Sequence, residues 1–246
     1  MKNDKQYKGQ IDYFSKEFGG LTDYTLHSWQ KSYVERIRAD LLGKNYKGKT
    51  LLDIATGSGY IAVEMAKLGL NVIATDLTPK AINNLNNYKK KLSLKNIKTK
   101  ISLAEKLDLP DDSVDYLVAN AILEHIPNEK QAIREWKRVL KKNGKMFITV
   151  PLKFRHIYPF LWLPNRIHDK KIGHLRRYDK KSLQDAFKLP VIKVYYSGHL
   201  MKIFGILLSL FLKNNKHDDY FEKLDKRNQN RVYGANNISI VFKNEK

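Results

Sequence analysis

The sequence contains no cysteine among its 246 residues. Disulfide bonds, thiol nucleophiles and cysteine-ligated metals are therefore excluded, and we expect no metal site. The N-terminal stretch MKNDKQYKGQ has no apolar segment, so we expect no signal peptide and a cytoplasmic location. The most apolar stretch, residues 200–212, is shorter than the about 20 residues that a bilayer-spanning helix needs.

Acidic residues are also scarce. The chain has 46 lysines and arginines against 25 aspartates and glutamates, which gives a formal net charge of +21. The excess is greatest in residues 151–246, which hold 20 basic and 8 acidic residues. Such a surplus attracts phosphates in nucleic acid or in anionic lipid. It is equally compatible with a solvated lysine surface.

The first 150 residues alternate between apolar and amphipathic segments. Residues 11–42 are expected to be mostly helical, as are 58–68, 79–93 and 128–141. Strands are expected at 50–54, 71–75, 99–103, 115–119 and 145–150. Apolar strands separated by amphipathic helices predict an α/β fold with a parallel sheet covered on both faces.

After residue 150 this alternation ends. Residues 153–178 form a basic, aromatic segment that we interpret as a lid insertion. We expect a helix at 180–187, strands at 191–196 and 238–242, and a polar loop at 214–236. For residues 200–212 we predict a helix packed on the sheet; a membrane-surface helix, a dimer interface and the wall of a lipid pocket are the alternatives.

We interpret residues 1–246 as a single domain with four parts. These are an N-terminal helical cap (1–45), a cofactor-binding core (46–152), the lid insertion (153–178) and an insertion formed by the apolar helix and a loop (197–236).

A glycine-rich turn follows the first expected strand in LLDIATGSGY, residues 51–60. It fits the G-x-G-x-x-A pattern of dinucleotide-binding turns, and no Gly-Lys-Ser/Thr follows, which excludes a Walker-type loop. Asp53 comes just before the turn, where a carboxylate would repel a pyrophosphate. A cationic ligand without phosphate, such as S-adenosylmethionine, suits this position better.

A second acid, Asp76, ends the next expected strand in VIATDLTP. A carboxylate at that place can accept hydrogen bonds from both ribose hydroxyls of a nucleotide-like ligand. Leu77 beside it can pack on an adenine ring. A helix cap or turn role is the alternative for both acids.

Three stretches then carry a resemblance to a known family: LLDIATGSGY, AEKLDLPDDSVDYLVANAILEHIPN and WKRVLKKNGKMFITVP. The chain resembles the class I S-adenosylmethionine-dependent methyltransferases, in the group that includes the ubiquinone/menaquinone enzymes. The resemblance covers about residues 45–152. It implies a three-layer α/β/α, Rossmann-like fold with a mostly parallel, seven-stranded sheet that ends in a C-terminal antiparallel hairpin.

The resemblance also implies S-adenosylmethionine as the cofactor and a set of residues around it. Asp53, Gly57 and Gly59 would line its methionyl part, Asp76 its ribose and Leu77 its adenine. The full expected set is Asp53, Ala55, Thr56, Gly57, Ser58, Gly59, Asp76, Leu77, Ala104, Glu105 and Asn120. Two positions depart from the family pattern, because Ala55 replaces a frequent glycine and Leu103 replaces a frequent aspartate.

Candidates for the chemistry come from two further stretches. His125 in Leu-Glu-His, and His174 and Tyr178 in GHLRRY, are candidate catalytic residues. Arg176 and Arg177 are candidates for binding an anionic acceptor. The alternatives are a histidine that orients its loop and a salt-bridged surface segment.

The resulting hypothesis is methyl transfer to a small-molecule or lipid-like acceptor, with peripheral membrane contact through 200–212. RNA methylation is the runner-up, because of the basic charge, but nucleic acid is the less favoured partner. A non-catalytic cofactor-binding protein and a nicotinamide dehydrogenase are further alternatives. The sequence does not fix the oligomeric state.

Overall fold

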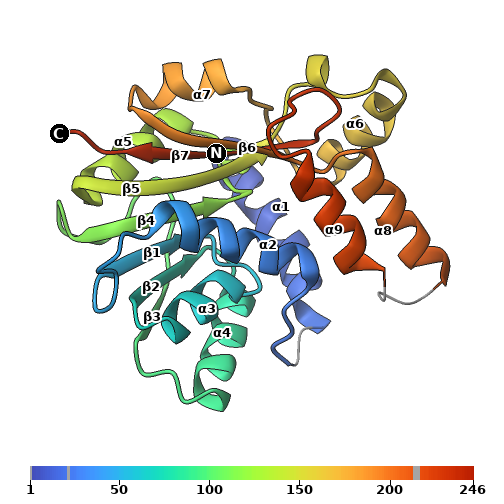
Figure 1. Cartoon of the computed structure of the whole chain (residues 1–246). Helices are drawn as coiled ribbons and strands as arrows, with labels where there is room; N and C mark the ends of the chain where they lie inside the picture. The colour runs from blue at the N-terminus through green and yellow to red at the C-terminus, as the bar shows by residue number, and fades with distance from the viewer. Residues whose placement is uncertain (1, 21–22, 213–216) are drawn as a thin grey trace.

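The computed structural model describes residues 2–20, 23–212 and 217–246. In this part of the chain a seven-stranded sheet has the order β3-β2-β1-β4-β5-β7-β6 (Figure 1). The strands are β1 (Thr50–Ile54), β2 (Asn71–Asp76), β3 (Ile97–Ile101), β4 (Val114–Asn120), β5 (Leu140–Pro151), β6 (Val191–Ser197) and β7 (Asn237–Lys243). Strand β7 is antiparallel to β5 and to β6, whereas the other pairs are parallel. The expected fold class is confirmed.

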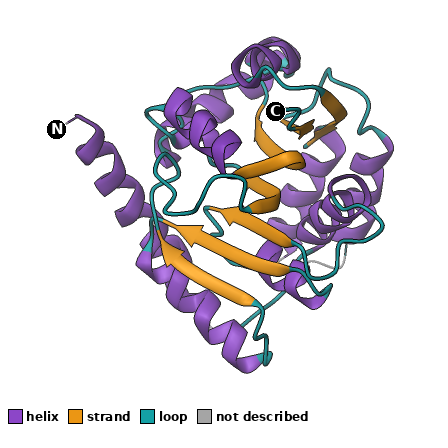
Figure 2. Cartoon of the chain, turned by 90° about the vertical axis from the view of Figure 1, so that its left-hand side faces the viewer, coloured by secondary structure: helices purple, strands orange, loops and turns teal. Residues whose placement is uncertain are grey.

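Helices cover both faces of the sheet. Those of the main body are α1 (Lys2–Glu17), α2 (Ser28–Arg36), α3 (Tyr60–Lys67), α4 (Pro79–Lys91), α5 (Glu129–Val139) and α7 (Lys180–Phe187). One apolar cluster buries Trp136 and Phe187 of α5 and α7 against the sheet, and the other buries residues of α2, α3 and α4 against its opposite face. The carboxyl ends of the parallel strands point toward the side where α1 lies (Figure 2).

Several expected boundaries differ from the structure, and two of the differences have a clear cause. Strand β3 occupies 97–101 instead of 99–103, because Ile97 supplies the buried side chain of this strand. Helix α5 ends at Val139, two residues before the expected end, because Leu140 already pairs with Val114 in the sheet. Asn143 and Gly144, a pair that often ends a helix, therefore lie within β5.

The segment after β6 contains two helices, α8 (Leu200–Leu212) and α9 (Asp218–Arg227). The expected loop at 214–236 is therefore wrong over α9, and its residues 214–216 lie outside the described part. Helix α8 forms as expected but packs along α9 and not on the sheet (Figure 1). Within the described residues, no helix has the length and apolar character that crossing a membrane requires.

Buried polar contacts hold this helical pair to the sheet. The carboxylate of Asp225 on α9 is fully buried. It accepts hydrogen bonds from the backbone amides of Gly198 (3.0 Å) and His199 (2.8 Å), just after β6. Its Oδ1 also lies 2.7 Å from Nδ1 of His199. Burial alone raises the pKa of Asp225, but these hydrogen bonds hold it below its usual value.

The basic segment 153–178 contains α6 (Trp162–Ile172) between short 3-10 turns. Exposed apolar side chains of this segment include Phe160, Leu163 and Ile167. The segment ends at Tyr178, which is buried in the core and pairs with Leu152, the residue just after β5.

Candidate active site

The turn between β1 and α3 has a backbone that favours glycine. Gly57 has φ +52° and Gly59 has φ +77°, both in the left-handed region. A Cβ atom on Gly59 would lie 3.0 Å from Cδ1 of Leu85, so the turn packs closely on α4. Ala55, which replaces a frequent glycine of the family, also has a positive φ of +54°.

Asp53 lies beneath this turn. Its side chain is 1 % exposed, and the Thr56 hydroxyl donates a hydrogen bond to its Oδ2 at 2.6 Å. Burial raises the pKa of Asp53 to about 7. The sequence predicted a carboxylate beside the cationic end of a ligand, but Asp53 is not among the residues that line the adjacent cavity. Its contacts are those of a residue that supports the turn.

Asp76 lies at the carboxyl end of β2 and faces the cavity. Its Oδ2 accepts from the Gly57 amide at 2.9 Å, and its Oδ1 accepts from the Thr78 amide at 2.7 Å. Burial raises the pKa of this carboxyl group, and the two amides oppose that shift. One carboxylate thus joins the ends of β1 and β2 and remains at the cavity wall.

A cavity of about 300 Å³ opens above these strand ends, and we call it the cofactor cavity. Seven of the residues expected there from the sequence line it, whereas Gly59 does not: Ala55, Thr56, Gly57, Ser58, Asp76, Leu77 and Asn120. The catalytic candidate His125 lines it as well. Helix α1 also forms part of the wall, through Gln10, Ile11 and Phe14, and this contribution was not predicted from the sequence. The aromatic, amphipathic pattern of that segment was the available signal. A small adjoining hollow contains Ala104 and Glu105 and shares Asp76 and Leu77 with the cofactor cavity.

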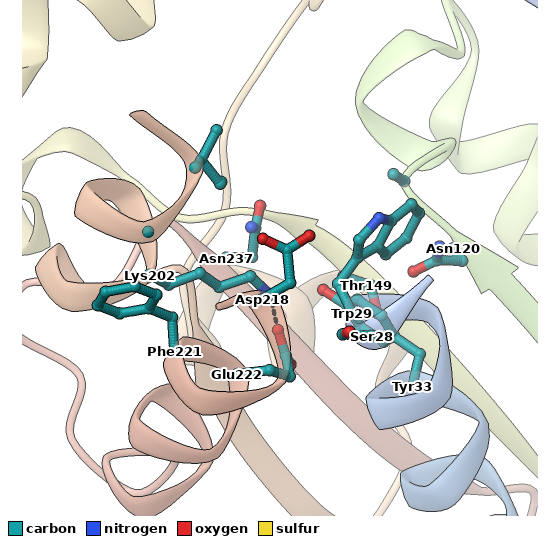
Figure 3. Close-up of a pocket in the computed structure, with 13 residues that line it drawn as sticks. Ser28, Trp29, Tyr33, Asn120, Thr149, Lys202, Asp218, Phe221, Glu222 and Asn237 are labelled. Carbon is teal, nitrogen blue, oxygen red and sulfur yellow. Dashed lines mark ion pairs between the residues drawn. The ribbon is translucent and has the colours of Figure 1, made fainter. Parts of the chain in front are cut away.

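A second cavity of about 380 Å³ lies between α2, α8 and α9 (Figure 3), and we call it the acceptor cavity. Trp29 and Tyr33 come from α2, whereas Ile206 and Phe221 come from α8 and α9. The charged side chains include Lys202, Asp218 and Glu222, and the Lys202 ammonium lies 2.7 Å from the Glu222 carboxylate. The 197–236 insertion therefore builds one wall of this cavity.

Asn120 lies where the two cavities meet. It lines both of them, together with Trp29 and Ala121. Its Nδ2 donates to the Tyr60 hydroxyl at 3.0 Å. Its Oδ1 is buried and has no hydrogen-bond partner. A buried carbonyl oxygen without a partner carries a free-energy cost, which a hydrogen-bond donor from a ligand would relieve.

The arginines and the tyrosine of the GHLRRY stretch make their contacts within the protein and not at a cavity. Arg177 donates to both carboxylate oxygens of Asp169, and Arg176 donates to the carbonyl oxygens of Ile126 and Pro127. The Tyr178 hydroxyl donates to Glu129, and burial raises the pKa of this phenol. No residue of 153–178 lines either cavity. The candidate anion site is thus occupied by contacts within the protein.

His125 is the one catalytic candidate that reaches the cofactor cavity. Its ring packs against Phe14 and His174, at centroid distances of 5.5 and 4.7 Å. Burial lowers the pKa of His125 to about 3, so the imidazole is neutral near pH 7 and is a weak base. His174 is also held with a lowered pKa, mainly by burial, and lies behind His125.

Comparison with known proteins places this arrangement in a family. A family model described as "Methyltransferase domain" matches residues 52–148. A ubiquinone/menaquinone biosynthesis C-methyltransferase of Rickettsia akari is 34 % identical over 146 residues, which cover 56 % of this chain and 56 % of that protein. A ubiquinone biosynthesis O-methyltransferase of Pelagibacter ubique is 33 % identical over 161 residues, which cover 58 % of this chain and 66 % of that protein.

The chain belongs to the class I S-adenosylmethionine-dependent methyltransferases. Its cofactor is therefore S-adenosylmethionine. The matched part spans about half to two thirds of the length of these curated relatives.

Solved structures agree on the fold. A phosphoethanolamine N-methyltransferase of Haemonchus contortus, solved in complex with S-adenosylmethionine, has a TM-score of 0.66 at 16 % identity. The match covers 95 % of this chain and 56 % of that enzyme. The [4+2]-cyclase SpnF has a TM-score of 0.65 at 15 % identity, and the match covers 96 % of this chain and 92 % of the cyclase. A cyclase on the same fold means that architecture alone does not define the reaction.

The buried Asp53 makes stability depend on pH. Between about pH 4 and pH 7 the folded protein holds a proton on Asp53 that the unfolded chain has lost, so rising pH destabilises the fold through this group. We expect Asp53→Asn to weaken this dependence by up to about 1.4 kcal/mol per pH unit. Urea unfolding of both proteins across this range measures it. Parallel pH profiles would contradict a protonated Asp53.

Proposed function

We propose that this chain transfers a methyl group from S-adenosylmethionine to a small, largely apolar, lipid-like acceptor. The observation that carries the proposal is the junction of the cofactor cavity and the acceptor cavity at Asn120. A methyl donor and its acceptor have to meet at such a junction, shielded from water. The names of the quinone-pathway relatives support an acceptor of this class.

The residues of the cofactor cavity fit the cofactor. Asp76 would accept hydrogen bonds from the ribose hydroxyls, and Leu77 would flank the adenine, with Ala104 and Glu105 at its edge. The glycine turn brings backbone amides to the cavity wall at the start of α3, where a helix N-terminus favours a carboxylate. Asp53 would contribute by keeping this turn in shape.

S-adenosylmethionine supplies a methyl group on a positively charged sulfur, which becomes a neutral leaving group. The task left to the protein is to place the acceptor atom in line and to exclude water. The unpartnered Oδ1 of Asn120 would accept a hydrogen bond from a hydroxyl or amine of the acceptor and orient its lone pair. His125 would pack beside the site as a neutral ring, because its pKa is far below 7.

The acceptor cavity favours a molecule with an apolar body and a few polar groups. Most of its lining surface is apolar, and the aromatic and aliphatic side chains in the wall are Trp29, Tyr33, Ala121, Ile206 and Phe221. Thr149 and Asn237 add polar groups on its sheet side, and the Lys202 ammonium is paired with the Glu222 carboxylate (Figure 3). A neutral ring compound with hydroxyl groups and a lipid tail matches this distribution, whereas two carboxylates against one lysine do not favour an anionic acceptor.

Cofactor binding is tested with Asp76→Asn. The substitution removes the negative charge and one acceptor, so affinity for S-adenosylmethionine should fall about 10- to 100-fold. Isothermal titration calorimetry measures the affinity, and circular dichroism checks the fold. Asp108→Asn, which alters an exposed aspartate paired with Lys100, is the matched control and should bind normally. An unchanged affinity for Asp76→Asn would remove the ribose role.

The acceptor class is tested by transfer of a tritiated methyl group to cell extract separated into lipid, RNA and small-molecule fractions. We expect label in the lipid fraction. Ile206→Glu places a charge in the acceptor cavity and should reduce this transfer at least about tenfold, with unchanged affinity for S-adenosylmethionine. Ile192→Glu changes a comparably exposed residue on β6 and should have no effect. Label confined to RNA would favour the alternative of an RNA methyltransferase.

We further propose that α8 contacts a membrane surface. One side of this helix, with Lys202, Gly205 and Ile206, lines the acceptor cavity. Phe204, Leu207 and Phe211 are exposed by 53, 59 and 85 % and follow one another at helical spacing. An apolar helix face on a protein with a net charge of +21 suits an anionic bilayer, from which a lipid-like acceptor could enter the cavity.

Sedimentation with vesicles of phosphatidylglycerol and phosphatidylcholine at low salt tests this contact. We expect the protein to co-sediment, and Leu207→Glu/Phe211→Glu to lower the bound fraction several-fold. Ile101→Glu/Ile192→Glu introduces the same charges at exposed positions of β3 and β6 and is the control. Equal binding by the two double variants would contradict a role of α8. Vesicle binding would then be explained by attraction between the basic protein surface and the anionic lipid alone.

A further inference from the structure

Three buried side chains with metal-binding atoms meet behind the cofactor cavity. Glu124 and His125 lie in the turn after β4, and His174 follows α6, about fifty residues later. One ligand atom from each lies within 4.8 Å of the other two. Their exposures are 1 % and 3 % for Glu124 and His125, and 9 % for the side chain of His174. The fold has thus gathered one carboxylate and two imidazoles in a largely buried space.

His174 is oriented as metal-binding histidines are. Its Nδ1 lies 2.7 Å from Oδ1 of Asp169, which fixes the proton on Nδ1 and leaves a lone pair on Nε2. That Nε2 lies 3.6 Å from Oε1 of Glu124. The separation is too long for a hydrogen bond, and it suits two ligands that share one cation at bonds of about 2.0–2.2 Å.

Two atoms of the cluster lack partners. Oε2 of Glu124 and Nδ1 of His125 are both buried, and neither has a hydrogen-bond partner. Leaving two polar atoms unpaired in one small volume is costly, and native proteins avoid it unless a water, an ion or a function is involved. A bound cation would satisfy the carboxylate and an imidazole of this cluster together.

The surroundings hold the three groups in place and do not repel a cation outright. The Leu175 amide donates to the Glu124 carbonyl oxygen at 2.8 Å and joins the two segments beside the cluster. Arg177, whose positive charge acts on Glu124, is paired with both oxygens of Asp169, at 2.6 and 2.8 Å. Asp169 therefore forms an ion pair with Arg177 and also orients the His174 ring.

We propose that Glu124, His125 and His174 bind one divalent cation, and that the cation is Zn²⁺. Two imidazoles and one carboxylate form a ligand set that zinc favours, whereas Mg²⁺ and Ca²⁺ favour oxygen ligands alone. The site ties the turn that follows Asn120 to the segment after α6. It fixes His125 at the wall of the cofactor cavity and takes no part in methyl transfer. It does not depend on the proposed acceptor.

The test uses the full chain, freed of metal with a chelator and then titrated with Zn²⁺ against a chromophoric chelator. We expect one Zn²⁺ per chain, and a rise in melting temperature on binding. Glu124→Gln and His174→Gln should each weaken binding at least about tenfold. His168→Gln is the control, because the His168 ring lies 6.2 Å from the ring of His174 and outside the cluster.

Replacement of Zn²⁺ by Co²⁺ gives a second readout on the unaltered protein. A visible absorption band of tetrahedral Co²⁺ with nitrogen and oxygen ligands is expected, and it should disappear in Glu124→Gln. The proposal is overturned if the wild type binds no stoichiometric Zn²⁺. It is also overturned if His168→Gln loses binding while Glu124→Gln keeps it, which would assign the metal to surface histidines.

Discussion

The hydrogen bond from the Gly57 amide to the Asp76 carboxylate is the contact on which the site depends. It joins the turn after β1 to the end of β2, so the two strand ends form one wall. The left-handed backbone at Gly57 and Gly59 is accessible mainly to glycine, and Asp53 supports the turn from beneath. Burial of the two acids raises both their pKa values, which is the electrostatic cost of a closed, well-ordered cofactor cavity.

The insertion between β6 and β7 lies outside residues 52–148, which match the family model. Helices α8 and α9 are anchored by the buried Asp225 and wall the acceptor cavity against α2. The same helix α8 presents apolar side chains to the outside. A single element therefore links the cavity to the surface, and the choice of acceptor would reside in this insertion more than in the shared core.

Most of the core could be predicted from the sequence, because strand periodicity, the glycine turn and the acids at strand ends are local signals. Helix α9 was missed, since its sequence is polar and, of its buried residues Phe221, Glu222 and Asp225, only Phe221 is apolar. The acceptor side was expected at Arg176 and Arg177, but their guanidinium groups are engaged by Asp169 and by backbone oxygens. Contacts between segments far apart in the chain, such as Glu124 with His174, leave no local pattern.

The central claim is that the two cavities meet at Asn120 and that methyl transfer occurs there. A crystal structure with S-adenosylhomocysteine tests it most directly. The account predicts the ribose beside Asp76 and the sulfur next to Asn120, facing the space between α2, α8 and α9. A ligand whose sulfur points away from that space, or one bound outside the cavity above β1 and β2, would contradict the account.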